Sequence, residues 1–467
     1  MKKFVAICLV MLLLLVIPVS AADAAEDNSY TASCSTLDSQ MPFLGNQQLV
    51  SNTKAAILYE TNTNTLMYAS NPDMQVPPAS LLKILTALIA IEKGSMTDVV
   101  TVRADVLGTL APDAAVVELV EDEVLTVKDL LYCMMVGSGN DAAVVLADHV
   151  MGSLAAFVAE MNRYAQELGC TGTNFTNVHG LHDENQYTTA RDVGKILAKA
   201  IQNEEFCEVF GAKYYNVPLT NKSDIRYLST QNYLINNDEV IIHYDSRVTG
   251  SRTAVHNDRT RSVASVANEG DMTLLCIVIG SESQFEKDGY SVKVYGGYEE
   301  TKQLLNLGFE GYKPAQILHK NQILLQSPVT NGNSYLSIGT HSDAYSVIPE
   351  NVDTNSLSYR YLDEINLTAP IEKGQRVSTL QVWCGSVCVA QTELFAMNSV
   401  QTIASMYEDS DASGNRTGFW TVFLYVVGSI VVIVIVVFIC LAVVRAVRLS
   451  RVRKKRKYRR RNRVRSR

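Results

Sequence analysis

Residues 77–92, PPASLLKILTALIAIE, decide the fold of this chain. Two prolines lead into an apolar helical pattern, and we expect the helix to cover residues 81–92. Ser80 stands where this helix begins, and Lys83 follows three residues later, so the two side chains lie on one helix face within reach of each other. Apolar surroundings would lower the pKa of Lys83 from its ordinary value of about 10.4, as a lysine base toward Ser80 requires.

A structural explanation of Ser80 and Lys83 is equally simple. A serine at a helix start commonly caps the helix, and a lysine in the first turn commonly stays solvated. Because a lone S-x-x-K pattern often arises by chance, it does not establish a catalytic site. The rest of the chain must therefore supply further support.

A second polar group, Ser138-Gly139-Asn140, lies between the apolar segment LLYCMMVG and the helical pattern DAAVVLADHV. A loop here would bring a hydroxyl and an amide together. Ser138 could relay a proton and Asn140 could hydrogen-bond a substrate amide. Either residue could instead cap the helix that follows.

In this order, the two motifs resemble those of the penicillin-binding D,D-carboxypeptidases, serine peptidases with S-x-x-K, S-x-N and K-T-G motifs. The resemblance continues through FVAEMNRYAQELGCTGTNFTNVHGLHDENQYTTARD, residues 157–192. Farther on, LTAPIEKGQRVSTLQV, residues 367–382, is similar to the β-rich C-terminal domain of the same proteins. The resemblance spans roughly residues 48–400, and the order of the motifs removes most of the chance-match risk.

The resemblance implies acyl transfer. Ser80 would attack the carbonyl between two D-alanines of a peptidoglycan stem peptide with Lys83 as base, and water would later release the acyl enzyme. Ser138 would pass the proton to the leaving amine, Asn140 would orient the substrate amide, and backbone N–H groups of Ser80 and Ser251 would stabilise the oxyanion. Penicillins and other β-lactams would acylate Ser80 as covalent inhibitors. No metal and no organic cofactor is implied.

The third motif departs from the family pattern, because Arg247-Val248-Thr249-Gly250 stands where K-T-G is expected. Valine cannot supply the positive charge that the lysine offers to the substrate carboxylate and to the serine of the second motif. Thr249 and Gly250 remain suited to hydrogen bonding with an extended peptide at a strand edge. Arg247 should face away from the cleft unless a bulge shifts the register. Arg252 is a more flexible substitute, although surface solvation explains either arginine equally well.

Three functions fit these motifs. The leading hypothesis is a membrane-anchored serine D-Ala-D-Ala carboxypeptidase that trims peptidoglycan stem peptides. The alternative is a catalytically weakened or inactive peptidoglycan-binding or sensing protein, which Val248 and the charged tail suggest. A β-lactamase shares the first two motif types, but the β-rich second domain and the membrane anchor argue against it.

Hydropathy patterns around the motifs indicate the fold. Apolar strands flank a turn within residues 55–70, strand patterns return at 240–244, 261–267 and 272–279, and helical periodicity fills the region between them. We expect an α/β (α+β) fold of the serine penicillin-binding, β-lactamase-like transpeptidase type, with an antiparallel sheet and a helical block, at residues 48–283. Short alternating segments predict a small β-rich domain at 284–402.

Both ends of the chain carry targeting features. Two lysines, an apolar run and small residues predict a signal peptide at residues 1–24, followed by a polar leader at 25–47. A polar linker at 403–418 precedes 419–444, whose 26 uncharged residues are long enough to cross a hydrocarbon core of about 30 Å as a transmembrane helix.

Charge is distributed unevenly along the chain. Residues 445–467 contain 14 Lys or Arg and no acid, whereas residues 25–444 contain 25 basic and 47 acidic residues, a net charge near −22. The positive-inside rule predicts a single-pass protein of the cell membrane with its catalytic domain extracellular and the basic tail cytoplasmic. So acidic a body is a poor nucleic-acid partner. The tail fits anionic membrane lipids better than nucleic acid.

Seven cysteines fall in the expected ectodomain: Cys34, Cys133, Cys170, Cys207, Cys276, Cys384 and Cys388. An odd number cannot pair completely within one chain, and their spacing does not follow a compact disulfide or metal-binding pattern. We expect buried thiols.

Overall fold

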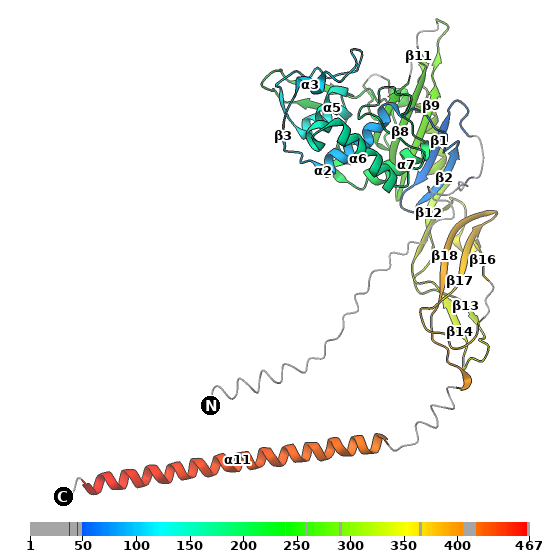
Figure 1. Ribbon diagram of the computed structural model, residues 1–467. Coiled ribbons are helices and arrows are strands. Elements are labelled where there is room, and N and C mark those ends of the chain that lie inside the picture. Colours follow the sequence, from blue (N-terminus) through cyan, green and yellow to red (C-terminus); the bar gives the residue numbers. More distant parts are fainter. Residues whose placement is uncertain are drawn as a thin grey trace. The chain divides into compact units, whose positions relative to one another are not determined.

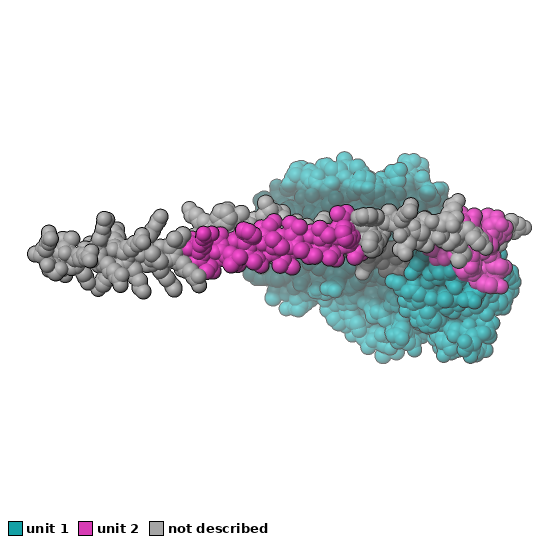
Figure 2. Space-filling model, turned by 90° about the horizontal axis from the view of Figure 1, so that it is seen from below, with its two compact units in different colours: residues 1–326, 337–366, 373–398 teal, residues 327–336, 367–372, 399–467 magenta. Residues whose placement is uncertain are grey.

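The computed structural model describes residues 37, 44, 49–238, 240–256, 259–288, 292–363, 367–404 and 417–464. The expected signal peptide, nearly all of the leader and most of the linker lie outside these residues. The chain divides into two compact units (Figure 2). The larger comprises residues 1–326, 337–366 and 373–398, and the smaller comprises residues 327–336, 367–372 and 399–467.

A five-stranded antiparallel sheet organises the first part of the larger unit, in the order β2-β1-β9-β8-β7. The strands are β1 (Ala55–Glu60), β2 (Thr65–Ser70), β7 (Val248–Val255), β8 (Thr260–Glu269) and β9 (Met272–Glu282). The β1–β2 hairpin turns through Asn64, whose φ of 54° lies in the left-handed region that asparagine tolerates. Strands from both ends of the region at residues 48–283 therefore meet in one sheet, as the hydropathy pattern predicts.

The strand that precedes β8 begins later than expected. Residues predicted to form a strand at 240–244 instead contain a 3-10 turn, η3 (Ile241–His243), in which Ile241 and Ile242 are exposed. The edge strand β7 starts at Val248. Three consecutive apolar residues were thus a misleading strand signal, because strand formation also needs a neighbouring strand with which to pair.

Helices cover one face of this sheet (Figure 1). They are η2 (Ala79–Leu82), α2 (Lys83–Lys93), α3 (Ala104–Leu107), α4 (Val127–Met135), α5 (Asn140–Met151), α6 (Leu154–Glu167), α7 (Ala190–Ala200) and α8 (Glu204–Phe210). Capping residues begin several of them; Thr126 and Asp129, for example, form a capping box at α4. The opposite face packs on α9 (Tyr298–Gly311) through a second apolar cluster. The sheet is therefore buried on both faces, which accounts for the continuous apolar run from Ala55 to Tyr59 in β1.

Short two-stranded pairs surround the helical block. They are β3 (Val99–Thr101) with β4 (Val124–Thr126), β5 (Tyr214–Val217) with β6 (Arg226–Ser229), and β10 (Gln284–Phe285) with β11 (Val292–Val294). The β5–β6 pair brings the residues after Ser229 to the site described below.

The following segment is rich in strands, as expected. Strands β12 (Tyr312–Leu318) and β15 (Ala344–Pro349) pair with each other. A second five-stranded sheet has the order β13-β14-β18-β17-β16. Its members are β13 (Ile323–Ser327), β14 (Leu336–Gly339), β16 (Ser358–Tyr361), β17 (Arg376–Cys384) and β18 (Val387–Ala396), with a 3-10 turn, η4 (Thr354–Ser356), before β16.

The C-terminal helix α11 covers Thr417–Val464. Its segment Thr421–Ala446 is 26 residues long with a mean hydropathy of 3.4, so it is long and apolar enough to cross a membrane. This helix could anchor the protein in a bilayer. The helix also continues into the basic sequence.

The cysteines differ from one another in environment. Cys133, Cys170 and Cys276 are buried, as expected. The expectation of buried thiols is wrong for three others: Cys207 is exposed on α8, Cys384 is half-buried, and Cys388 forms a disulfide bond. Cys384 and Cys388 lie near the β17–β18 turn, where core packing does not enclose them.

Candidate active site

Ser80 lies in η2, one turn of 3-10 helix that runs directly into α2 at Lys83. In 3-10 geometry the residues i and i+3 eclipse each other, so Ser80 and Lys83 share one face even though the regular helix begins later than expected. Ser80 is half-buried, and the residue before it, Ala79, has a strained φ of 43°. The backbone therefore presents Ser80 at a forced bend.

Lys83 is completely buried, and its Nζ donates a hydrogen bond of 2.7 Å to the carbonyl oxygen of Ser138. Burial, and secondly the charge of Arg252, hold the pKa of Lys83 well below its ordinary value, against an opposing effect of Asp141. Both main causes disfavour the ammonium form. The lowered pKa favours the uncharged amine of Lys83, which is the form that accepts a proton.

Ser138 accepts hydrogen bonds from two basic side chains. Its backbone has a φ of 60°, a left-handed conformation that is costly for serine and common at functional sites. Its carbonyl oxygen accepts from Lys83, and its Oγ accepts a 2.8 Å hydrogen bond from Nη2 of Arg252. Asn140, nearly buried at the start of α5, donates its backbone N–H to the carbonyl oxygen of Ala115 at 2.8 Å.

Arg252 reaches this group from the edge strand β7. Only 5% of its surface is exposed. Besides Ser138, its Nη1 donates to the carbonyl oxygen of Met135 at 2.7 Å, and its Nε donates to that of Ser80 at 3.3 Å. Burial lowers the pKa of Arg252 to about 10, so the guanidinium stays charged at neutral pH. The positive charge that the family's third motif would supply is therefore present, on Arg252.

Val248, Thr249 and Gly250 lie elsewhere. Val248 is buried in the apolar cluster on the α9 face of the sheet, and Thr249 and Gly250 border a separate cavity of about 440 Å³. The expected position of all three beside Ser80 needs correction. A register shift between Val248 and Gly250 in the β7–β8 ladder changes the facing of the strand, so that Ala254, beyond it, joins the helix-facing core.

A cavity of about 520 Å³ opens at these residues. Its polar lining includes Ser80, Asp113, Ser138, Asn140, His179, Ser229, Thr230, Gln231, Arg252, Thr253 and Arg261. Val255 also lines the cavity, whereas Ser251, expected to contribute an oxyanion donor, is not among its described lining residues. Thr253 and Val255 on the edge strand are thus better placed to face a ligand than Ser251.

The loop at His179-Gly180 supports the bend that presents Ser80. Gly180 has a φ of 92°, and a side chain there would place its Cβ 2.1 Å from the carbonyl oxygen of Ala79. The Oδ1 of Asn177 accepts from the Gly180 N–H at 2.7 Å and fixes the loop. Burial, then the charge of Lys83, lower the pKa of His179 to about 4, so it is neutral at the cavity wall. These residues belong to the segment that resembles the family, but sequence reasoning assigned them no role.

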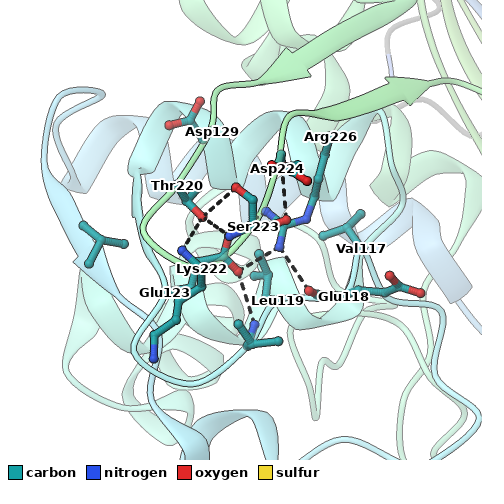
Figure 3. Close-up of polar contacts among 12 residues, drawn as sticks. Val117, Glu118, Leu119, Glu123, Asp129, Thr220, Lys222, Ser223, Asp224 and Arg226 are labelled. Atoms are coloured by element: carbon teal, nitrogen blue, oxygen red, sulfur yellow. Dashed lines mark hydrogen bonds and ion pairs between the residues drawn. The ribbon is translucent and has the colours of Figure 1, made fainter.

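An ion pair between the buried Glu123 and the half-buried Arg226 links two segments near the cavity (Figure 3). Arg226 on β6 donates to both carboxylate oxygens of Glu123, at 2.6 and 2.8 Å, and Thr220 donates to one of them at 2.8 Å. The carboxylate of Asp141 accepts from the backbone N–H of Val117 at 3.0 Å. The loop before Glu123 and the end of β6, which both border the cavity, are therefore held by charged hydrogen bonds.

Comparisons with known proteins show which family the chain resembles. Residues 44–283 match the family described as D-alanyl-D-alanine carboxypeptidase, and residues 312–402 match the penicillin-binding protein 5, C-terminal domain. D-alanyl-D-alanine carboxypeptidase DacA of Haemophilus influenzae is 30% identical over 74% of this chain and 84% of that protein. DacF of Bacillus subtilis is 28% identical over 71% of this chain and 82% of that protein.

Solved structures are similar over the same region. Penicillin binding protein 5 from Haemophilus influenzae is 29% identical, with a TM-score of 0.59 over 75% of this chain and 98% of that one. DacD from Francisella tularensis is 20% identical, with a TM-score of 0.63 over 78% of this chain and 98% of that one. The second similarity concerns the fold alone.

Proposed function

The chain belongs to the D-alanyl-D-alanine carboxypeptidase family, and from this membership we propose how its cavity residues release the terminal D-alanine of a peptidoglycan stem peptide. The family makes the chain a serine-type carboxypeptidase with a penicillin-binding fold, acting on D-Ala-D-Ala substrates and binding β-lactams. The observation that carries the proposed roles is the convergence of Lys83 and Arg252 on Ser138, with Arg252 also bonded to the backbone of Ser80.

In the acylation step, the Oγ of Ser80 attacks the carbonyl carbon of the penultimate D-alanine while its proton moves to the uncharged Nζ of Lys83. The backbone N–H of Ser80 and the cavity end of β7 stabilise the negative oxygen of the tetrahedral intermediate. The C–N bond breaks as the leaving nitrogen gains a proton. Terminal D-alanine departs, and an ester remains on Ser80.

Ser138 carries the proton to the leaving nitrogen. Its Oγ already accepts a hydrogen bond from Arg252, so its own hydrogen remains available for donation, and Lys83 can replenish it. Asn140 orients the amide of the substrate. In deacylation, a water molecule gives a proton to Lys83 while the water oxygen attacks the ester carbon. The bond between that carbon and the Oγ of Ser80 then breaks, and Lys83 returns the proton to Ser80.

Arg252 supplies the positive charge that the lysine of the K-T-G motif would supply. Its charge disfavours protonation of Lys83, and its three hydrogen bonds hold Ser138 beside Ser80. The alternative of an inactive sensing protein rested on Val248 and the charged tail, and the buried Arg252 in the cavity supports an active enzyme instead. We propose an active enzyme.

We also propose a single-pass arrangement. Helix α11 would span the cell membrane, with the catalytic domain at 48–283 and the β-rich domain at 284–402 outside and the basic tail at 445–467 inside. The apolar Thr421–Ala446 segment and the charge asymmetry around it support this orientation. The tail would bind anionic lipid headgroups.

The detergent-solubilised full-length protein tests the catalytic roles. We expect intact-mass spectrometry to show one penicillin adduct on the wild type and none on Ser80→Ala, and we expect the wild type to release D-alanine from a pentapeptide. Ser95→Ala, which alters an exposed serine of a turn, is the matched control and should keep the adduct. An adduct on Ser80→Ala would refute the assignment of the nucleophile.

A further inference from the structure

The β5–β6 pair has one exposed face that carries two tyrosines. Cross-strand pairing places Tyr214 opposite Ser229 and Asn216 opposite Tyr227, so these four side chains lie on one face of the pair. All four residues are exposed, Tyr227 most of all at 76%, whereas the residues that alternate with them are buried or half-buried. The outer face of β5 and β6 is therefore an exposed aromatic surface without a charged residue.

The inner face fixes this pair of strands to the helical block. Tyr215 stacks on Tyr132 of α4, with ring centres 3.9 Å apart, and donates its hydroxyl to Asp129 at 2.8 Å. Arg226 forms the ion pair with Glu123 (Figure 3). Because these contacts hold both strands from behind, the outer tyrosines keep a fixed position, and a ligand that binds them does not have to order a loop.

The groups on the outer face suit a neutral sugar. A sugar ring packs its apolar C–H face on aromatic rings, and its hydroxyls hydrogen-bond to amides and hydroxyls. The hydroxyl of Tyr214 donates to Asp238, which orients that ring. Within the described residues, the side-chain polar atoms of Asn216 and Tyr227 have no hydrogen-bond partner in the protein. They are available to a ligand, and no cation lies on this face to favour an anionic one.

The outer face continues into the cavity that contains Ser80. Ser229 lines this cavity, and Tyr227 lies two residues farther along β6, a step of about 7 Å. In a pentapeptide substrate, four residues separate the scissile bond from the N-terminal attachment point, and they span about 14 Å when extended. A group attached to that end can thus reach Tyr227 while the scissile bond lies at Ser80. In peptidoglycan this group is a sugar of the glycan strand.

We propose that the outer face of β5 and β6, with Tyr214, Asn216 and Tyr227, binds the sugar to which the stem peptide of the substrate is attached. The enzyme then prefers stem peptides that carry this sugar over free peptides of the same sequence. This inference rests on the proposed function, because that function places the stem peptide in the cavity. It extends the recognised substrate from the peptide to the glycan strand.

The test compares two substrates with the detergent-solubilised full-length protein. One is a pentapeptide ending in D-Ala-D-Ala, and the other is the same pentapeptide attached to N-acetylmuramic acid. We expect kcat/KM of the wild type to be about tenfold higher for the sugar-bearing peptide, the factor that one aromatic contact supplies. Tyr227→Ala should remove this preference and change turnover of the free pentapeptide less than about twofold. Tyr227→Phe keeps the ring and should retain most of the preference.

Tyr345→Ala is the matched control, because Tyr345 is 48% exposed on the two-stranded β12–β15 pair and is not a described lining residue of the cavity. It should keep the preference. Asn216→Ala tests the same face independently and should slow only the sugar-bearing peptide.

Equal losses of Tyr227→Ala on both substrates would overturn the proposal and indicate a structural role. A preference that is undiminished in Tyr227→Ala, or absent from the wild type, would also overturn it and leave the outer face to a protein partner. Failure of the proposed function is distinguishable, since the wild type would then release D-alanine from neither substrate and form no penicillin adduct.

Discussion

Replacement of Arg252 by glutamine should lower the acylation rate most strongly at neutral pH. The reaction requires uncharged Lys83, so the rate rises as pH increases through the pKa of this lysine. Burial and Arg252 both hold that pKa below its ordinary value. Without the guanidinium, only burial remains, the pKa rises, and the pH–rate profile moves to higher pH.

The hydrogen bonds to Ser138 set the size of this effect. Lys83 and Arg252 contact different oxygens of one residue, at 2.7 and 2.8 Å. Charges held in this way are roughly 6 to 7 Å apart, which at an effective dielectric constant of about 20 corresponds to about 2.5 kcal/mol. Acylation should therefore slow by up to about 70-fold from the electrostatic effect alone, the full factor applying at a pH low enough for Lys83 to be protonated in both proteins.

Acylation by a fluorescent penicillin, followed from pH 6 to pH 10.5, measures this shift. The deficit of Arg252→Gln should shrink as pH rises, because Lys83 loses its proton in both proteins at high pH. Arg252→Lys keeps a charge and serves as the matched variant, with a profile nearer to the wild type. A deficit that is constant across the pH range would refute the electrostatic reasoning and leave only the positioning of Ser138.

Three further perturbations follow from buried contacts. Gly180→Ala should reduce acylation by at least about 100-fold, since the new Cβ would collide with the Ala79 carbonyl at the bend before Ser80, and stopped-flow acylation would measure it. Val248→Lys should not increase activity, because the position lies in the core and away from the cavity. The buried lysine should lower the free energy of unfolding, measured by urea denaturation, by about 3 kcal/mol, whereas Val248→Ile should be nearly neutral. Burial is the largest single influence on Glu123 and opposes its ionisation, but the hydrogen bonds from Arg226, Thr220 and the backbone of Val120, with the charge of Arg226, together outweigh it and lower the pKa. The stabilisation therefore exists above the ordinary pKa and is lost as pH falls through the lowered one. Glu123→Gln should cost about 3 kcal/mol at pH 7, and a cost that does not diminish in acid would contradict this reasoning.

The first two motifs could be predicted because their geometry is local. Three-residue spacing places Ser80 and Lys83 on one face in a 3-10 turn as well as in an α-helix, so the later start of α2 did not matter. Ser138 and Asn140 occupy the short segment between α4 and α5. The structure brings Lys83 and Ser138 into contact.

The third motif could not be predicted from its letters. Thr249 and Gly250 match the family pattern, but the register shift before Gly250 changes which face of β7 meets the helical block. A bulge depends on pairing with β8, and no short stretch of sequence encodes it. Simple alternation of side chains along the strand therefore placed Val248 to Gly250 at the cavity, where the structure has Arg252, Thr253 and Val255.

The sequence by itself determined the family, the serine and lysine of the first motif, the alternation of strands and helices, and the apolar segment near the C-terminus. These properties follow from periodicity, spacing and composition, which act over a few residues. Only the tertiary structure decided that Arg252 contacts Ser138, that Val248 belongs to the core, and that Arg261 lies at the cavity beside Thr253. The reason is physical: Arg252 and Ser138 are 114 residues apart, and contacts across or between strands form only after strand register and burial are established, which arise from packing of the whole sheet.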